Sequence, residues 1–156
     1  MIDPDTFRSV LGRFVSGVTV ITVSGSRGEC GMTVSSFCSL SLSPPMVLLC
    51  LDHGARMYEV LQSATHFVVN VLDASQEVVA RRFSDQGVDR FDGVGFQPSQ
   101  SGAPILNDVL AWMECRRVDV FPGGDHTIFT GVVEVADSRP GDPLVYYRGG
   151  YTELGK

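Results

Sequence analysis

Residues 29–51 read Glu-Cys-Gly-Met-Thr-Val-Ser-Ser-Phe-Cys-Ser-Leu-Ser-Leu-Ser-Pro-Pro-Met-Val-Leu-Leu-Cys-Leu, and this stretch decides the fold. Residues 31–36 combine one glycine with three hydroxyl side chains, so the backbone can approach a ligand closely and offer donors to an anion. Pro44 and Pro45 end the hydroxyl-rich part because neither residue can donate to a strand ladder. Residues 46–51 are apolar enough for a strand buried on both faces. A Ser/Thr-rich strand and turn without a ligand would have the same composition.

The composition predicts one globular domain, residues 1–156. The chain is 44% hydrophobic and 19% charged, and a domain of this length buries roughly 70% of its unfolded surface. The formal net charge is −6 and Lys156 is the only lysine, which argues against binding to nucleic acid. Because there is no long apolar run and no secretory signal pattern, we expect a cytoplasmic protein without a membrane span.

The four cysteines predict neither a metal site nor a disulfide framework. They show no C-x-x-C spacing, and only Cys50 lies close in sequence to a histidine, His53, so no zinc site is expected. Cys50 lies in the apolar run and Cys115 follows an apolar pair, so we expect both to be small buried hydrophobes in a reducing compartment.

The hydrophobic periodicity predicts three helices among short strands. The first helix starts at Asp3-Pro4 and ends by Gly17, with its apolar residues on one face. A second helix is expected over residues 55–64, and Asp73 with Gln76 resembles a capping box that opens a third helix to Phe83. Strands are expected over residues 18–23, 46–51, 66–72, 112–121, 127–136 and 144–147.

Six or seven short strands at hairpin-like spacing predict a mainly β domain, either an antiparallel barrel or a sandwich. Residues 84–104 carry glycines and prolines among polar residues and show no clear period. A segment of this length without regular structure is often a lid or a partner-contacting loop, although a plain surface excursion would look the same.

Several classes of enzyme are excluded by their missing motifs. The sequence holds no G-x-G-x-x-G fingerprint, no Walker loop and no G-x-S-x-G elbow. What remains is the hydroxyl-rich segment beside Phe37, a histidine in a Gly-Gly-Asp-His loop, and aromatic residues near the end of the chain. These groups suit a flat, aromatic, anionic ligand, but they do not identify it.

Five segments in register resemble the short-chain flavin reductase family. They are residues 31–47 (Gly-Met-Thr-Val-Ser-Ser-Phe-Cys-Ser-Leu-Ser-Leu-Ser-Pro-Pro-Met-Val), 67–72 (Phe-Val-Val-Asn-Val-Leu), 80–83 (Ala-Arg-Arg-Phe), 124–133 (Gly-Asp-His-Thr-Ile-Phe-Thr-Gly-Val-Val) and 143–151 (Pro-Leu-Val-Tyr-Tyr-Arg-Gly-Gly-Tyr). The resemblance covers nearly the whole chain.

The resemblance implies an FMN-binding split β-barrel, a Greek-key antiparallel barrel with a few peripheral helices. It also implies a homodimer with flavin near the dimer interface. Members of the family use NADH or NADPH to reduce FMN or FAD, and the reduced flavin passes to a separate monooxygenase. A barrel that holds FMN as a non-catalytic carrier or sensor is the alternative, and a barrel that binds no flavin is a third reading.

The resemblance also assigns roles by position. Met32, Thr33, Val34, Ser35, Ser36 and Ser39 would line the isoalloxazine ring and part of the ribityl phosphate. Asp52, His53, Arg56 and Met57 would lie at the phosphate, with Phe83 close by. His126 matches the family histidine associated with nicotinamide, and Asp125 and Tyr147 are placed with it. Because hydride transfer needs no tuned acid or base, His126 is expected to position the nicotinamide, and no residue is assigned as catalytic.

The sequence departs from the family pattern after the apolar strand. Residues 53–57 read His-Gly-Ala-Arg-Met where many relatives carry small hydroxyl residues. This removes two neutral phosphate donors, and the guanidinium of Arg56 can replace them with a charge-assisted contact. The preference between FMN and FAD is therefore left open.

Overall fold

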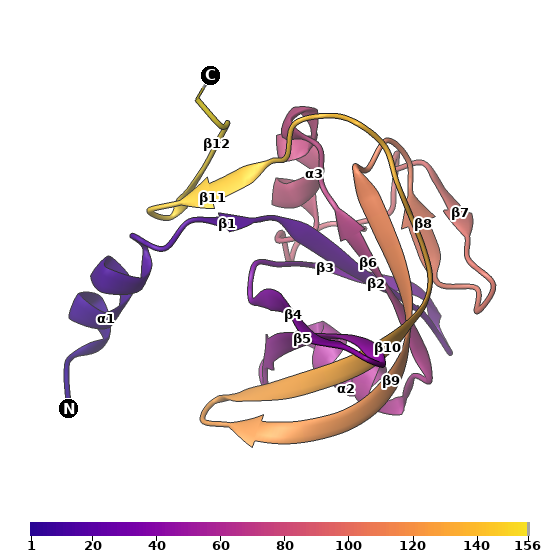
Figure 1. Ribbon diagram of the computed structural model, residues 1–156, viewed down its shortest axis with the longest axis horizontal. Coiled ribbons are helices and arrows are strands. Elements are labelled where there is room, and N and C mark those ends of the chain that lie inside the picture. Colours follow the sequence, from indigo (N-terminus) through magenta and orange to yellow (C-terminus); the bar gives the residue numbers. More distant parts are fainter. Residues whose placement is uncertain (156) are drawn as a thin grey trace.

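The computed structural model describes residues 1–155, and its main element is a seven-stranded antiparallel sheet (Figure 1). The strand order is β3-β2-β6-β9-β10-β5-β4. The bounds of these strands are β2 Thr19–Gly25, β3 Gly28–Val34, β4 Phe37–Leu42, β5 Pro45–Asp52, β6 His66–Val71, β9 Ala111–Gly123 and β10 His126–Ser138.

Three helices and two small sheets surround this sheet. The helices are α1 Pro4–Leu11, α2 Arg56–Ser63 and α3 Glu77–Arg82, the last preceded by the 3₁₀ turn η1 Ala74–Gln76. One small sheet pairs β1 Ser16–Gly17, β11 Val145–Tyr147 and β12 Gly150–Thr152, and the other pairs β7 Phe96–Pro98 with β8 Pro104–Leu106. Within the described residues no helix is both long and apolar enough to cross a membrane.

The long hairpin β9–β10 bends the main sheet around the core. Its register shifts between Phe129 and Gly131 and again between Val133 and Val135. Such bulges increase local twist and bend a strand. Figure 1 shows the hairpin curving across the base of the molecule, with β5 beside it. The core consequently forms two main clusters of buried residues, one closed by α2 and the other by α3.

The capping signals of the sequence are confirmed. The Asp3 carboxylate accepts hydrogen bonds from the backbone amides of Asp5 and Thr6, as an N-cap does. Asp73 and Gln76 form the predicted capping box, although the first turn after it is a 3₁₀ turn. The first helix ends at Leu11, with Gly12 as its C-cap, and so is shorter than the sequence indicated.

The prediction that residues 46–51 are buried on both faces is wrong. Val47, Leu49 and Leu51 are buried, whereas the residues between them are only half-buried. Because β5 lies in a sheet with one core-facing side, burial alternates along it. Cys50 is consequently half-buried, contrary to expectation, while burial raises the pKa of the Cys115 thiol to about 12.

The number of strands was underestimated. Residues 84–104 contain β7 and lead into β8, so this segment is not entirely irregular. The strand β12 was also missed. Arg148 and Gly149 both have positive φ angles, of 53° and 77°, and they form the two-residue turn that returns β11 into β12. Such turns favour glycine, and the Arg-Gly pair gave only a weak signal.

Candidate functional site

A groove runs along β3, on the side where α2, α3 and the loop after α3 meet. Its largest hollow has a volume of about 390 Å³ and adjoins a second of about 380 Å³ and a third of about 140 Å³. The largest hollow is lined by Met32, Thr33, Asp52, Gly54, Ala55, Arg56, Phe83, Ser84, Gln86 and Arg90. It shares Arg56 and Arg90 with the second hollow, and Thr33 and Ser84 with the third.

The groove depends on the absence of a side chain at Gly31. A Cβ atom there would lie 2.6 Å from a ring carbon of Phe83 and 3.2 Å from a ring carbon of Phe91. The two phenylalanine rings therefore pack directly over the backbone of β3. They also contact each other edge to face, with their centroids 5.0 Å apart.

Hydrogen bonds join the outer edge of β3 to the end of α3 and to the loop that follows it. The amide of Thr33 donates to the carbonyl of Phe83 at 3.2 Å, and its hydroxyl donates to the carbonyl of Ala80 at 2.7 Å. Arg90 donates from Nη1 to the carbonyl of Gly31 at 2.8 Å. These contacts cover an edge that would otherwise offer free backbone groups to another strand.

Arg56 and Arg90 give the groove a positive end. Both arginines line the same two hollows, and burial together with the charge of Arg56 lowers the pKa of Arg90. Within residues 1–155, neither side chain forms an ion pair with a carboxylate. A phosphate bound between them would relieve the repulsion and accept charge-assisted hydrogen bonds.

Arg90 is held in place by several contacts. Its Nε donates to the carbonyl of Asp85 at 2.8 Å, in addition to the bond that Nη1 makes with Gly31. Arg82 in turn donates to the carbonyls of Arg90 and Asp89, at 3.0 and 2.8 Å. The loop after α3 therefore presents a fixed guanidinium to the groove.

The start of α2 adds a second source of positive potential. Its N-cap is Ala55, which makes no side-chain capping bond, and the preceding Gly54 also lines the large hollow. The first amide groups of a helix lack partners within the helix and carry the positive end of its dipole. Together with Arg56, this helix start is suited to a phosphate.

Two of the predicted nicotinamide residues, Asp125 and His126, lie beside Asp52 at the edge of the large hollow. Nδ1 of His126 lies 2.7 Å from Oδ1 of Asp125. The pairing of β10 with β5 places His126 opposite Asp52, and the ligand atoms of Asp52, Asp125 and His126 all lie within 4.8 Å of one another. The hydrogen bond with His126 and its charge lower the pKa of Asp125. The register of the barrel thus brings residues from positions 52 and 126 together.

Only some of the residues predicted to bind flavin line the groove. Met32, Thr33, Asp52, Arg56 and Phe83 line the largest hollow, and Ser35 lines the smallest. His53 is exposed, and its Nε2 lies 2.9 Å from the hydroxyl of Thr127.

Five further predicted residues do not line the groove. Val34 and Met57 are buried in the core cluster under α2. The hydroxyl of Ser36 donates to the carbonyl of Cys50 at 2.8 Å, and Ser39 lies on β4 at the far edge of the sheet. Tyr147 does not line the groove, whereas its neighbours Tyr146 and Tyr151 line the smallest hollow. The roles assigned to these residues stay predictions.

Sequence reasoning missed Arg90 and the residues around it. Ser84, Gln86 and Arg90 all lie in residues 84–104, for which the sequence predicts either a lid or partner-contacting loop, or an ordinary surface loop. The available signal was the unusual length of that segment, but nothing in its composition indicated which of its charges would face a ligand.

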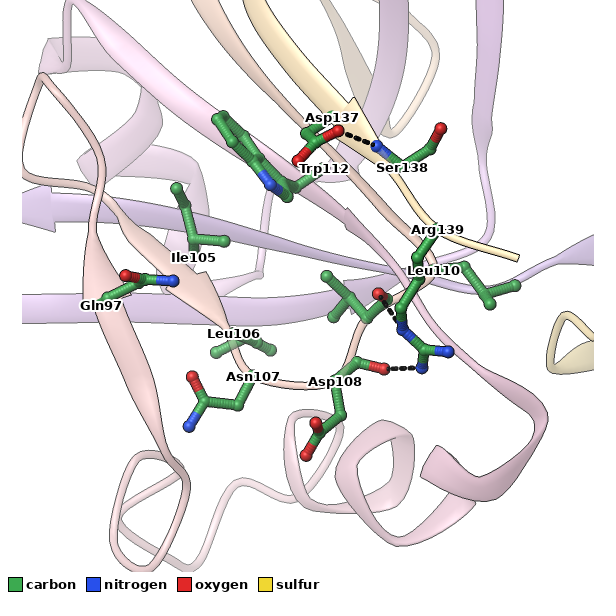
Figure 2. A pocket seen from close by; sticks show the side chains of 11 residues that line it. Gln97, Ile105, Leu106, Asn107, Asp108, Leu110, Trp112, Asp137, Ser138 and Arg139 are labelled. Atoms are coloured by element: carbon green, nitrogen blue, oxygen red, sulfur yellow. Dashed lines mark hydrogen bonds between the residues drawn. The ribbon is translucent and has the colours of Figure 1, made fainter. Parts of the chain in front are cut away.

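A separate hollow of about 340 Å³ lies between the β7–β8 hairpin and the open end of the β9–β10 hairpin, where β9 begins and β10 ends (Figure 2). It contains none of the predicted site residues. Its arginine, Arg139, donates to the carbonyls of Val109 and Asp108 and to the carboxylate of Asp73. Because this guanidinium is already paired with protein groups, the hollow is less suited to an anionic ligand than the groove along β3.

The comparisons with known proteins identify the family. A family model described as flavin reductase like domain matches residues 11–155. The reductase subunit HsaB of a flavin-dependent monooxygenase from Mycobacterium tuberculosis is 42% identical over 156 residues, covering 98% of this chain and 83% of that protein. The FMN reductase (NADH) SmoA from Agrobacterium fabrum is 41% identical over 146 residues, covering 94% of this chain and 83% of that protein.

A solved structure shows the same fold. The NADH:FAD oxidoreductase SgcE6 from Streptomyces globisporus C-1027, in complex with NAD and FAD fragments, superposes with a TM-score of 0.94 at 41% identity. The match covers 99% of this chain and 96% of that one. This chain belongs to the flavin reductase-like domain family, and the predicted split-barrel fold is confirmed.

Proposed function

We propose that this protein is an NAD(P)H-dependent flavin reductase that supplies reduced flavin to a separate monooxygenase. The relatives support this directly, because they include a monooxygenase reductase subunit, an NADH-dependent FMN reductase and an NADH:FAD oxidoreductase. The observation that carries the proposal is the groove along β3, where Arg56 and Arg90 line a hollow together with the half-buried Met32 and Ala55.

The residues of the groove fit a flavin phosphate ester. Met32 and Ala55 line the large hollow and are only half-buried, so they leave apolar surface that a flat ring can contact. Arg56, Arg90 and the start of α2 lie where a phosphate would need compensation of its charge. A bound flavin supplies the electron sink that accepts a hydride from a reduced nicotinamide.

The chain itself binds and orients the reactants. Arg90 anchors the loop after α3 to the backbone of β3, which fixes one side of the groove. Asp125 holds Nδ1 of His126, so that Nε2 faces away from the carboxylate and is free to contact a second ligand. Because orientation is the main requirement for hydride transfer, we assign His126 a positioning role and no proton transfer.

Steady-state oxidation of NADH in air tests the enzymatic function. Purified protein is assayed alone and with FMN, FAD or riboflavin over a concentration series. We expect a low rate without flavin and a saturable increase with added FMN or FAD, because flavin acts as a substrate that leaves. If FMN binds but no flavin accelerates NADH oxidation, the protein is a non-catalytic carrier or sensor. If added flavin neither binds nor raises the melting temperature, the groove is not a flavin site.

Substitution of His126 tests its positioning role. His126→Ala should raise KM for NADH by about tenfold and leave kcat near the wild-type value, because it removes a contact that is equal in the ground and transition states. Asp125→Asn should give a smaller change in the same direction, since the imidazole loses its orienting carboxylate. A collapse of kcat with KM unchanged would show instead that His126 acts in the chemical step.

We further propose that the protein is a homodimer in which α1 packs against a second copy. Phe7, Val10 and Leu11 lie on one face of this helix with exposed fractions of 53%, 60% and 50%, and Phe14 follows at 79%. The helix projects from the body in Figure 1, and none of its residues is buried. Contiguous apolar surface of this kind marks an interaction site in soluble proteins.

Sedimentation velocity tests the dimer. Wild-type protein at micromolar concentration should sediment as a dimer, and the double variant Phe7→Glu/Leu11→Glu should sediment mainly as a monomer because two charges are placed in the interface. Val78→Glu, at an exposed position on α3, is the matched control and should remain dimeric. A monomeric wild-type protein, or a double variant that stays fully dimeric, would refute this arrangement.

A further inference from the structure

The hollow in Figure 2 is separate from the groove along β3 and has no assigned ligand. Its volume is about 340 Å³, and none of its lining residues lines any of the three hollows of the groove. Its walls come from β7, β8, the segment between β8 and β9, the start of β9 and the end of β10. A ligand bound here would occupy a site distinct from that of the flavin.

The charge that this hollow leaves unpaired is negative. Arg139 donates to the carboxylate of Asp73 at 3.0 Å and to two backbone carbonyls of the lining, so its guanidinium is already paired. Asp108 and Asp137 also line the hollow and are exposed. Within residues 1–155, neither of these two carboxylates forms an ion pair. A cation in the hollow would therefore meet two carboxylates that have no charged partner.

An aromatic ring lies beside one of these carboxylates. The pairing of β9 with β10 places Trp112 directly opposite Asp137, and residues opposite each other on antiparallel strands point to the same face of the sheet. Figure 2 shows the carboxylate next to the indole. The amide of Ser138 donates to Oδ1 of Asp137 at 2.8 Å and so orients the carboxylate. The indole is half-buried: it packs against the buried Ile105 and lines the hollow with the rest of its surface.

The β8 side of the hollow adds further hydrogen-bond acceptors. Gln97 and Asn107 are exposed lining residues, and their amide oxygens can accept. Asp108 follows Asn107 and has a φ of 62°, a left-handed conformation that is costly for a residue other than glycine. Its carbonyl accepts from Nη2 of Arg139 at 2.5 Å. This contact holds Asp108 at the edge of the hollow.

We propose that this hollow binds a guanidinium group on an apolar stem, as found in an arginine side chain or in a small guanidino compound. A planar guanidinium stacks on an indole face and carries a fork of N–H donors that matches a carboxylate. Trp112 and Asp137 offer both partners to one such group. The apolar lining residues, which include Ile105, Leu106 and Leu110, can cover the methylene stem.

Other classes of ligand fit this hollow less well. An anion would be repelled by Asp108 and Asp137, which no protein cation neutralises within residues 1–155. A purely apolar ligand would remove water from the same carboxylates without replacing its hydrogen bonds. An alkylammonium ion has the right charge, but it is a compact point charge without the planar fork.

The indole signal of Trp112 tests the binding. Trp112 is the only tryptophan of the chain, so the NMR spectrum of ¹⁵N-labelled protein contains one indole N–H signal, which reports on this hollow. At constant ionic strength, butylguanidinium should shift this signal along a saturable curve. Butylammonium should bind about threefold more weakly or less tightly still. An indole signal that does not respond to butylguanidinium would overturn the proposal.

Removal of single carboxylates tests the site itself. Asp137→Asn should weaken butylguanidinium at least about threefold, because a neutral amide replaces the charged partner of the guanidinium. Asp119→Asn removes the same charge from an exposed position of β9 outside the hollow, and it should bind within about 1.5-fold of the wild type because distant exposed charges are screened. Asp108→Asn gives a second test if Asp137→Asn does not fold, since asparagine tolerates the left-handed conformation. It should also weaken binding.

The outcomes decide the proposal and identify the source of the guanidinium. Equal effects of Asp137→Asn and Asp119→Asn would reduce the binding to net charge and overturn the site. If N-acetylarginine methylamide binds at least as tightly as butylguanidinium, the hollow receives an arginine side chain of another protein. If the hollow takes butylguanidinium but excludes the arginine derivative, its ligand is a small guanidino compound. None of these measurements uses flavin or NADH, so the result is independent of the proposed reductase function.

Discussion

The packing of Phe83 and Phe91 against the bare backbone of Gly31 is the contact on which the site depends. Phe83 closes the C-terminal end of α3, and Phe91 anchors the loop that follows, so one glycine fixes two segments at once. With these rings in place, the edge of β3 is covered by hydrogen bonds to Phe83, Ala80 and Arg90. The backbone groups of this edge strand, which could otherwise pair with another strand, are thus covered, and β3 lines the proposed ligand groove.

The remainder of the fold brings charge and a positioning histidine to that floor. The antiparallel register of β5 and β10 sets His126 opposite Asp52, next to the positive start of α2. The bulges in β9–β10 bend the sheet so that this hairpin can curve around the core under α2. The residues proposed to bind phosphate and those proposed to bind nicotinamide therefore lie on neighbouring elements. Asp52 and His126 are close in space although they are more than seventy positions apart in the sequence.

Local signals in the sequence were enough for much of the fold. The Asp3 cap and the Asp73–Gln76 capping box each depend on residues that are neighbours in the chain, and the structure contains both. The hairpin between residues 112–121 and 127–136 is also present, but its strands extend to Gly123 and His126 and leave a turn of two residues. The half-burial of Cys50 was not predictable in this way, because it depends on which side of the sheet receives the core.

The family resemblance placed candidate site residues on β3 and at the β5–α2 junction, but none on the loop after α3 that also lines the groove. Arg90 is brought to Gly31 by a tertiary hydrogen bond across 59 positions, and no local pattern carries that information. Tyr146 lines the groove while Tyr147 does not, because neighbouring residues of a strand face opposite sides and the phase of a short strand is hard to read from sequence.

The most direct measurement is residue-resolved hydrogen exchange and FMN titration of Gly31→Ala, with Gly17→Ala as control because a Cβ at Gly17 meets no atom within 4 Å. We predict that Gly31→Ala loses protection in residues 84–95 and binds FMN at least about tenfold more weakly, because Phe83 and Phe91 must move away from β3. Protection in β9 and β10 should be unchanged in both variants, which shows that the barrel remains folded. Wild-type FMN affinity together with wild-type protection of residues 84–95 in Gly31→Ala would contradict the account.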